Sequence, residues 1–329
     1  MKDGFIKVAA GTPDIKVADC EYNRAAITAL IDKAYAAGVR ILALPELCIT
    51  GYTCQDLFFQ QALLDGALNA LREITEHTAG SDMLISVGCP LRFRGELYNC
   101  AVVLKDGKIL GVVPKKFLPN YNEFYEKRHF TAAPEGQFDI ELFGESVPFG
   151  LGLLFECRTM PELVFAAELC EDLWAAEPPS ISLALGGATI IANLSASNET
   201  IGKDMYRREL VNSQSARLLC GYVYASAGSG ESTQDLVFGG HDIIAENGII
   251  LAESKLYSTG LTVTEIDVQK LASERRRNTS FTGGIRPGMR HIPFDMEVRS
   301  TELTRIVRRT PFVPNTAAET DKRCEDILT

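Results

Sequence analysis

Short, largely apolar runs recur along the first 270 residues of the chain, separated by longer stretches of mixed character. Apolar runs bounded by polar or turn-forming residues are typical of strands that are buried in a sheet. The strands predicted in this way are 5–10, 39–44, 83–87, 101–104, 109–113, 164–167, 188–192, 222–225, 243–244, 249–251 and 261–266. An Asp-Gly pair at 106–107 and an Asn-Gly pair at 247–248 predict two tight hairpins.

Other stretches place apolar residues three and four positions apart, which gives a helix one apolar face. Ile27, Leu30 and Ile31 begin such a face, and Gly38 is placed to end the helix that carries it. The helices predicted from this spacing are 23–37, a segment that begins after residue 56, and 203–219. Helices interleaved with apolar strands and hairpins indicate an α/β fold with mixed sheets covered by helices.

The pattern weakens near residue 270. Charged residues at 274–277, a Gly-Gly pair at 283–284 and the stretch 310–315 carry little periodicity. We therefore expect one domain over 1–270 and a C-terminal arm or linker over 271–329, in which 319–328 could form a short helix. We also expect a further segment to follow this arm in a longer protein.

Composition and charge narrow the class of protein. The chain has 329 residues, 46% hydrophobic and 23% charged, with 33 basic and 43 acidic residues and a net charge of −10. These values are typical of an ordinary globular protein, and the acidic balance argues against nucleic acid or an anionic membrane as the main partner. Nine cysteines lie far apart without metal-ligand spacing, and the N-terminus lacks a signal-peptide pattern, so we expect free thiols, no bound metal and a cytoplasmic location.

Three reactive side chains follow predicted buried strands. Glu46 comes after the run 39–44, Lys115 after 109–113 and Cys170 after 164–167. Each has an ordinary structural interpretation: an acid facing water, a solvated lysine pair with Lys116, or a small buried thiol. Strand ends are also rigid places where a cleft can form, so the three residues are candidates for one catalytic site.

The acids around Cys170 carry information of their own. Glu168, Glu171 and Asp172 disfavour a thiolate, so a reactive Cys170 needs a base and a nearby cation. Glu46 could take the thiol proton and Lys115 could stabilise a tetrahedral oxyanion if the fold brings them together. Spacing alone does not decide this. The four histidines are isolated, which leaves a Cys–His pair as a weaker alternative.

The order of these motifs resembles the Glu-Lys-Cys triad of the nitrilase (carbon–nitrogen hydrolase) superfamily. It is most similar to one branch, the glutaminase domain of glutamine-dependent NAD+ synthetases. The segments that carry the resemblance are 44–52 (LPELCITGY), 115–126 (KKFLPNYNEFYE), 170–174 (CEDLW), 193–198 (NLSASN), 227–233 (AGSGEST) and 245–248 (AENG).

The resemblance implies a nitrilase-type four-layer αββα sandwich and a role for each matching residue. Glu46 is implied as the general base, Lys115 as the oxyanion stabiliser and Cys170 as the nucleophile. Glu123 resembles the supporting second glutamate, with Glu126 as its competitor for that role. The implied contacts to the glutamine substrate are Tyr52, Tyr121, Ser197 and Arg208.

The implied reaction converts L-glutamine and water into L-glutamate and ammonia through a glutamyl thioester, without a cofactor. The ammonia would serve NAD+ synthesis on a synthetase domain, where ATP, magnesium and deamido-NAD would bind. That domain's Ser-Gly-Gly-x-Asp-Ser loop does not occur in this sequence, although 310–314 resembles the connector that precedes the domain. A homo-oligomer, with the arm packed on a neighbouring subunit, is also implied.

Two other functions remain open. Triad residues do not set specificity, so the chain could be another carbon–nitrogen hydrolase of the ω-amidase or carbamoyl amidase type. Comparing turnover of glutamine, asparagine and ω-amides separates these. The second alternative is a non-catalytic assembly module, which predicts that Cys170 does not react with iodoacetamide.

Overall fold

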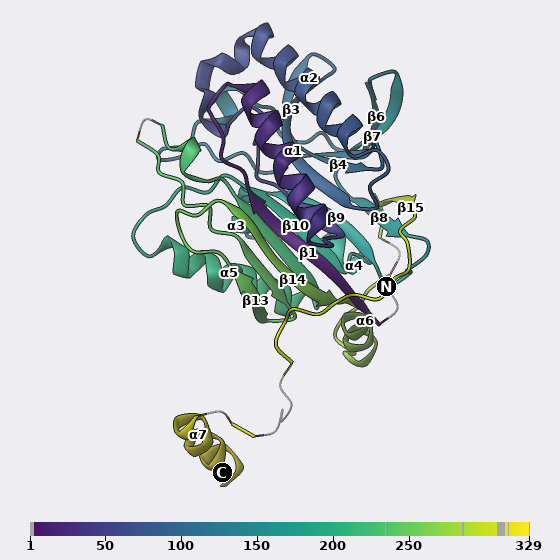
Figure 1. Ribbon diagram of the computed structural model, residues 1–329, viewed down its shortest axis with the longest axis vertical. Helices are drawn as coiled ribbons and strands as arrows, with labels where there is room; N and C mark the ends of the chain where they lie inside the picture. Colours follow the sequence, from purple (N-terminus) through teal and green to yellow (C-terminus); the bar gives the residue numbers. More distant parts are fainter. Residues whose placement is uncertain (1–2, 234, 285, 308–312, 315, 329) are drawn as a thin grey trace.

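A computed structural model describes residues 3–233, 235–284, 286–307, 313–314 and 316–328. Its described strands form two mixed sheets (Figure 1). The order in the eight-stranded sheet is β14-β1-β2-β3-β4-β5-β7-β6, and in the seven-stranded sheet it is β13-β12-β11-β10-β9-β8-β15.

The strands of the first sheet are β1 (Phe5–Thr12), β2 (Ile41–Ala43), β3 (Leu84–Phe93), β4 (Glu96–Lys105), β5 (Lys108–Pro114), β6 (Gln137–Leu142), β7 (Glu145–Gly150) and β14 (Gly260–Asp267). Those of the second are β8 (Leu153–Cys157), β9 (Val164–Leu169), β10 (Ile190–Ser195), β11 (Gly221–Ser226), β12 (Ile243–Glu246), β13 (Ile249–Glu253) and β15 (Arg290–Phe294). The α-helices are α1 (Cys20–Ala36), α2 (Gln61–His77), α3 (Glu171–Trp174), α4 (Pro179–Leu185), α5 (Lys203–Arg217), α6 (Val268–Arg277) and α7 (Ala317–Leu328). The short 3-10 helices are η1 (Tyr52–Phe59), η2 (Glu126–Arg128) and η3 (Ser229–Glu231).

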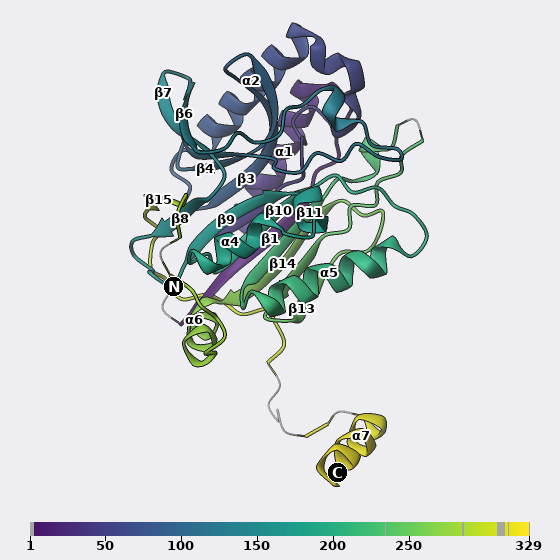
Figure 2. The same cartoon turned by 180° about the vertical axis from the view of Figure 1, so that it is seen from behind.

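The two sheets pack face to face, and helices cover their outer faces (Figures 1 and 2). One apolar cluster joins α1 and α2 to the first sheet and includes Ile27 and Leu71. A second lies between the sheets, with Val8 and Phe155 among its members. A third joins the second sheet to α4 and α5 through Leu183 and Val211. Three successive buried layers of side chains make the four-layer αββα sandwich that the resemblance implied.

The predicted hairpins are confirmed, and their backbone explains the residues chosen. Lys105 pairs with Lys108 across the first turn, where Asp106 and Gly107 have φ of 49° and 73°. The Asn-Gly pair at 247–248 has φ of 45° and 80° between β12 and β13. Positive φ at both central positions is what a two-residue hairpin with the twist of the strands requires, and Asn, Asp and Gly tolerate it best.

Every predicted strand and helix has a counterpart, but some elements give no sequence signal of the kind used above. In β6 polar and apolar residues alternate, because one face of this strand is buried more than the other. The edge strand β15 contains Pro293 and pairs in parallel with β8. Part of the predicted arm therefore joins the sandwich, since α6 also crosses residue 270 and buries Leu271.

Further along the arm, residues 301–305 bind to the sandwich through charged groups. Arg305 Nη1 donates to Glu246 Oε2 at 2.9 Å, and the backbone N–H groups of Thr304 and Arg305 donate to Glu265 at 3.0 Å each. Glu246 and Glu265 are both fully buried, so Arg305 supplies countercharge to Glu246, and the two backbone N–H groups satisfy oxygens of Glu265. The connector-like segment 310–314 lies largely outside the described residues. The helix predicted at 319–328 is present as α7, and none of its described residues is buried.

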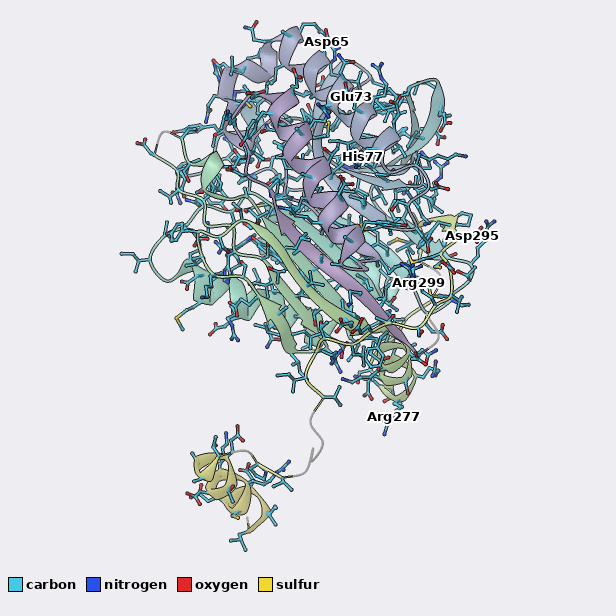
Figure 3. All side chains as sticks on the ribbon, viewed as in Figure 1. Asp65, Glu73, His77, Arg277, Asp295 and Arg299 are labelled. Carbon is cyan, nitrogen blue, oxygen red and sulfur yellow. The ribbon has the colours of Figure 1, made fainter. Side chains whose placement is uncertain are left out.

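Polar side chains lie on the outer surface of α2, among them Asp65, Glu73 and His77 (Figure 3). In the parts of the chain that the structure describes, no helix is both long enough and apolar enough to cross a bilayer.

Candidate active site

Three strand ends from the two sheets meet at one buried site. Glu46 follows β2, Lys115 follows β5 and Cys170 follows β9. The Lys115 ammonium lies 2.6 Å from Glu46 Oε1, and both groups are close enough to Cys170 to act on its thiol electrostatically. The fold therefore brings Glu46, Lys115 and Cys170 together, which residue spacing alone could not decide.

Glu46 is completely buried and held by three donors. Its Oε1 accepts hydrogen bonds from Lys115 Nζ and Asn99 Nδ2, each at 2.6 Å, and its Oε2 accepts from the Ala196 backbone N–H at 2.9 Å. These bonds fix the carboxylate in one orientation. Gly88 on β3 allows this placement, because a Cβ there would lie 2.2 Å from the Leu47 nitrogen.

The second carboxylate on Lys115 is Glu126. Its Oε1 lies 2.6 Å from Lys115 Nζ and accepts a further hydrogen bond from the Tyr52 hydroxyl at 2.8 Å. Glu123, the residue preferred from the resemblance, instead accepts a hydrogen bond from Asn198 Nδ2 at 2.6 Å. The geometry thus favours Glu126, the competing candidate, for the position beside the lysine. Sequence spacing could not separate two glutamates three residues apart in an irregular loop.

Burial and charge set the proton affinities in this cluster. Burial, reinforced by the nearby Glu46 carboxylate, raises the pKa of Glu126 to about 7 despite the opposing effect of Lys115. Burial alone would lower the pKa of Lys115, but Glu126 and Glu46 reverse this and hold it well above its usual range. Lys115 is therefore a cation, bound between two carboxylates that compete for its charge.

Cys170 lies at a tight turn between β9 and α3. Its φ of 38° and ψ of −99° form a strained backbone for a residue with a side chain. Burial and then the Glu46 carboxylate raise the pKa of the thiol, while Lys115 and the Ala196 backbone N–H act in the opposite direction. The resting group is a thiol, so it needs a base at the moment of reaction.

Asp172 connects this turn to the two residues that follow Lys115. Its Oδ1 accepts hydrogen bonds from the backbone N–H groups of Lys116 at 3.1 Å and Phe117 at 2.8 Å, and its Oδ2 accepts from Leu169 N at 3.1 Å. Burial raises the pKa of Asp172 to about 7. One buried carboxyl therefore links the residues beside Lys115 and Cys170 in a fixed relation.

The two predicted tyrosines lie close to the cluster. The backbone of Tyr52 is held by Glu231, whose Oε1 accepts from its N–H at 2.9 Å, and its hydroxyl binds Glu126. The Tyr121 hydroxyl donates to Glu171 at 2.9 Å, and its ring is half-exposed. The pKa of Tyr121 is raised by partial burial and by Glu171, with smaller effects from Cys170.

Ser197 is buried near the site, but Arg208 is not part of it. Arg208 lies on the exposed side of α5 and pairs with Glu253 at 2.9 Å. Its neighbour Arg207 is fully buried and donates to Ser197 Oγ at 3.3 Å. The helix rotates adjacent residues by about 100°, so a one-residue difference decides which arginine faces inward.

Lys203 is a site residue that the sequence analysis missed. Its ammonium lies 5.4 Å from the centre of the Trp174 ring, donates to Asn198 Oδ1, and interacts electrostatically with Cys170. Burial lowers its pKa. The position directly after Gly202, at the start of α5, was the available sequence signal, because a cation is unfavourable at a helix N-terminus and needs another reason to be there.

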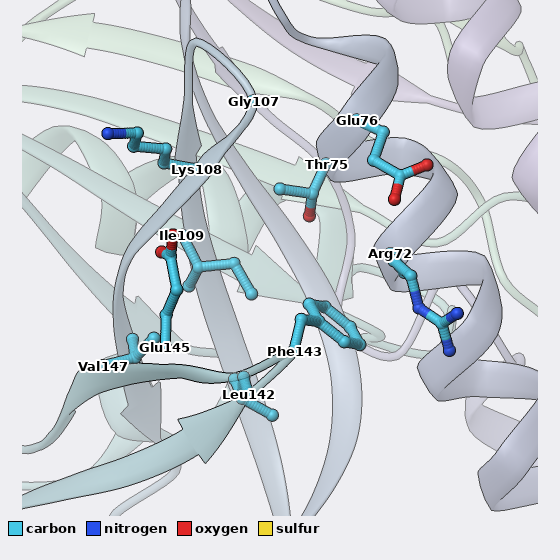
Figure 4. Close-up of a pocket in the computed structure, with 10 residues that line it drawn as sticks. All are labelled: Arg72, Thr75, Glu76, Gly107, Lys108, Ile109, Leu142, Phe143, Glu145 and Val147. Carbon is cyan, nitrogen blue, oxygen red and sulfur yellow. The ribbon is translucent and has the colours of Figure 1, made fainter.

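A separate pocket lies on the other side of the first sheet. It has a volume of about 430 Å³, and Arg72, Lys108, Phe143 and Glu145 are among the residues around it (Figure 4). Among its described lining residues there are no predicted site residues. The candidate site is therefore the buried cluster at the strand ends.

An αββα sandwich that carries a carboxylate, a lysine and a cysteine at its strand ends defines a class of amide-bond hydrolases. The family profile described as "Carbon-nitrogen hydrolase" matches residues 7–276. The chain belongs to this family.

Curated relatives of the chain indicate to which branch of this family it is similar. It is 40% identical over 321 residues to the glutamine-dependent NAD(+) synthetase of Mycobacterium tuberculosis, covering 94% of this chain and 47% of the relative. The human protein of the same name is 31% identical, with 80% of this chain and 38% of the relative covered. The chain spans about half the length, or less, of these curated relatives.

Solved structures agree in fold. A glutamine-dependent NAD(+) synthetase from Cytophaga hutchinsonii superposes with a TM-score of 0.71 at 31% identity, over 79% of this chain and 42% of that one. A nitrilase-superfamily amidase from Nesterenkonia has a TM-score of 0.64 at 18% identity, over 84% and 98% of the two chains. This chain is thus homologous to the glutaminase part of NAD+ synthetases.

Proposed function

We propose that this chain hydrolyses the side-chain amide of L-glutamine to L-glutamate and ammonia. The observation that carries the proposal is the buried contact of Lys115 with Glu46 beside the Cys170 thiol, in a chain homologous to NAD+ synthetases. A base, a cation and a nucleophile in one water-poor site are what acyl transfer from an amide requires.

The reaction follows from the roles of the three groups. Glu46 takes the proton of Cys170 as the sulfur attacks the amide carbon, and Lys115 donates a hydrogen bond to the oxyanion that forms. The proton on Glu46 passes to the amide nitrogen, the C–N bond breaks and ammonia leaves a glutamyl thioester. Glu46 then deprotonates a water that attacks the thioester, and the returned proton restores the thiol.

Glu126 supports the role of Lys115. With one oxygen on Lys115 and on the Tyr52 hydroxyl, it orients the ammonium and stabilises its charge. We therefore assign the supporting role to Glu126, while Glu123 holds Asn198. Glu46, Lys115 and Cys170 keep the roles of base, oxyanion stabiliser and nucleophile in this proposal.

Charges around the thiol favour glutamine among amides. Free L-glutamine carries an α-carboxylate and an α-ammonium group, so its pocket needs one cation and one anion beyond the triad. Lys203 and Glu171 meet this need, because both interact with charged groups of the site and lie beside Trp174 and Tyr121 respectively. A simple ω-amidase or carbamoyl amidase would not need both charges.

We further propose that the ammonia serves NAD+ synthesis on a synthetase domain, where ATP and deamido-NAD would bind. The support is the name and the greater length of the relatives, of which this chain matches less than half. A homo-oligomer in which the 271–329 arm contacts a neighbour remains part of this proposal.

The test is release of glutamate and ammonia from L-glutamine by the full chain, with Cys170→Ala and Cys220→Ala as a matched pair. Both cysteines are buried, but Cys220 lies in the third apolar cluster. We expect turnover in the wild type and in Cys220→Ala, and loss of turnover in Cys170→Ala. Asparagine and butyramide are tested alongside. Faster turnover of butyramide than of glutamine would overturn the choice of substrate.

A further inference from the structure

Arg207 is a buried cation next to the candidate site, and its guanidinium contacts four other residues. Its Nη1 lies 2.7 Å from Glu199 Oε1 and 2.9 Å from His241 Nδ1. Its Nη2 donates to Ser197 Oγ and to the Asn198 backbone oxygen, both at 3.3 Å. The side chain is fully buried, so these contacts replace the water that the guanidinium loses on folding.

The contact with Arg207 determines the tautomer of His241. A guanidinium only donates hydrogen bonds, so His241 Nδ1 must be the acceptor and the ring proton must lie on Nε2. That nitrogen lies 2.8 Å from Glu253 Oε1 and donates to it. The other oxygen of Glu253 accepts from Arg208 at the surface. His241 is therefore a fixed acceptor that sets the plane and reach of the Arg207 guanidinium.

Asn198 connects Arg207 to Lys203. While its backbone oxygen accepts from Arg207, its Oδ1 accepts from Lys203 Nζ and its Nδ2 donates to Glu123 at 2.6 Å. Only this orientation of the amide satisfies both the ammonium and the carboxylate. Asn198 thus contacts Arg207 through its backbone oxygen and Lys203 through its side-chain oxygen.

A lysine ammonium has a long flexible stem, so its position in a pocket has to be imposed by its neighbours. We propose that Arg207, with His241 as its acceptor, is a positioning residue that fixes Lys203 through Asn198 and so sets the preference of the site for an amide bearing a distal carboxylate. This role rests on the proposed function, because Lys203 is the cation assigned there to the glutamine α-carboxylate.

Steady-state kinetics test the proposal with two substrates and two neighbouring variants. Butyramide has the reacting amide and chain of glutamine without its α-substituents. We expect Arg207→Lys to lower kcat/KM for glutamine by about tenfold or more, the effect of losing a charged buried hydrogen bond, mainly through KM. For butyramide the change should stay within about twofold. Arg208→Lys, one residue along α5 and half-exposed, is the control and should leave both substrates unchanged.

Histidine variants test the acceptor. Gln at 241 can accept from Arg207 and donate to Glu253 in the way His241 does, whereas Leu can do neither. We expect His241→Gln to keep the wild-type ratio of glutamine to butyramide turnover and His241→Leu to shift that ratio toward butyramide. A merely structural role would lower both substrates together in His241→Leu.

A chemical probe separates this proposal from the proposed function. 5-Bromopentanoate places a carboxylate four bonds from the carbon that Cys170 attacks, as glutamine does, and 5-bromopentanamide is its neutral match. Alkylation of Cys170, followed by mass spectrometry, should favour the acid in the wild type and lose this preference in Arg207→Lys. This readout needs no glutamine turnover. Equal preference in both proteins, or an equal loss of turnover for both amides, would overturn the role of Arg207.

Discussion

Replacing Glu126 by Gln removes one of the two negative charges on Lys115 while keeping the size of the side chain. The hydrogen bond at 2.6 Å would persist with a neutral acceptor, so the loss is the charge-assisted part of the contact. Hydrogen bonds to charged groups are worth about 1.5–3 kcal/mol and neutral ones about 0.5–1.5 kcal/mol, so the charge-assisted part is about 1–1.5 kcal/mol. If the loss falls on the transition state, kcat for glutamine decreases by about 5- to 13-fold.

The pKa of Glu126 adds a pH dependence. Because burial raises that pKa to about 7, the wild-type carboxyl is increasingly protonated below pH 7 and then resembles the variant. The ratio of wild-type to Glu126→Gln activity should therefore rise between about pH 6 and 8 and level off above that, as expected for a single titrating group. Coupled detection of glutamate at each pH measures the ratio.

Glu123→Gln is the matched control, three residues away in the same loop. Glu123 contacts Asn198 and not Lys115, so this variant should show a smaller loss of kcat without the rise in the activity ratio. A larger loss in Glu123→Gln than in Glu126→Gln would refute the assignment and restore the residue first suggested by the resemblance. An activity ratio for Glu126→Gln that is independent of pH would refute the electrostatic reasoning.

Three further predictions concern stability, each measured by chemical denaturation. Gly88→Ala should lower the free energy of unfolding by about 3 kcal/mol or more, because its Cβ would lie 2.2 Å from the Leu47 nitrogen; an unchanged midpoint would contradict this. Arg305→Ala should cost about 2 kcal/mol, since it removes countercharge from buried Glu246, and Arg305→Lys should recover part of that loss. If Arg305→Ala equals the wild type, the arm is not anchored there. Burial raises the pKa of Asp242 to about 7, so the folded chain binds more protons than the unfolded chain, and this group's stabilisation is lost as pH rises through about 7. Asp242→Asn should flatten that decline between about pH 4 and 7 by up to about 1.4 kcal/mol per pH unit, and an identical slope would exclude the effect.

The sequence by itself determined the elements whose pattern is local. Buried strands, amphipathic helices and both Gly-containing hairpins could be predicted because periodicity and positive φ leave a direct trace in residue type. The same holds for Glu46, Lys115 and Cys170 as candidates, since each comes within three residues after the end of an apolar run. Strands that are half-exposed or lie at an edge, such as β6 and β15, leave a weaker trace and could not be predicted in this way.

Tertiary structure decided which side chains meet. Glu126 rather than Glu123 contacts Lys115, Arg207 rather than Arg208 faces inward, and Lys203 joins the site from the start of α5. Each choice depends on the path of a loop or the rotation of a helix relative to the strands that carry the other site residues. Residue type records what a side chain can do, but the contacts that select its partner are non-local, so only the packed sandwich specifies them.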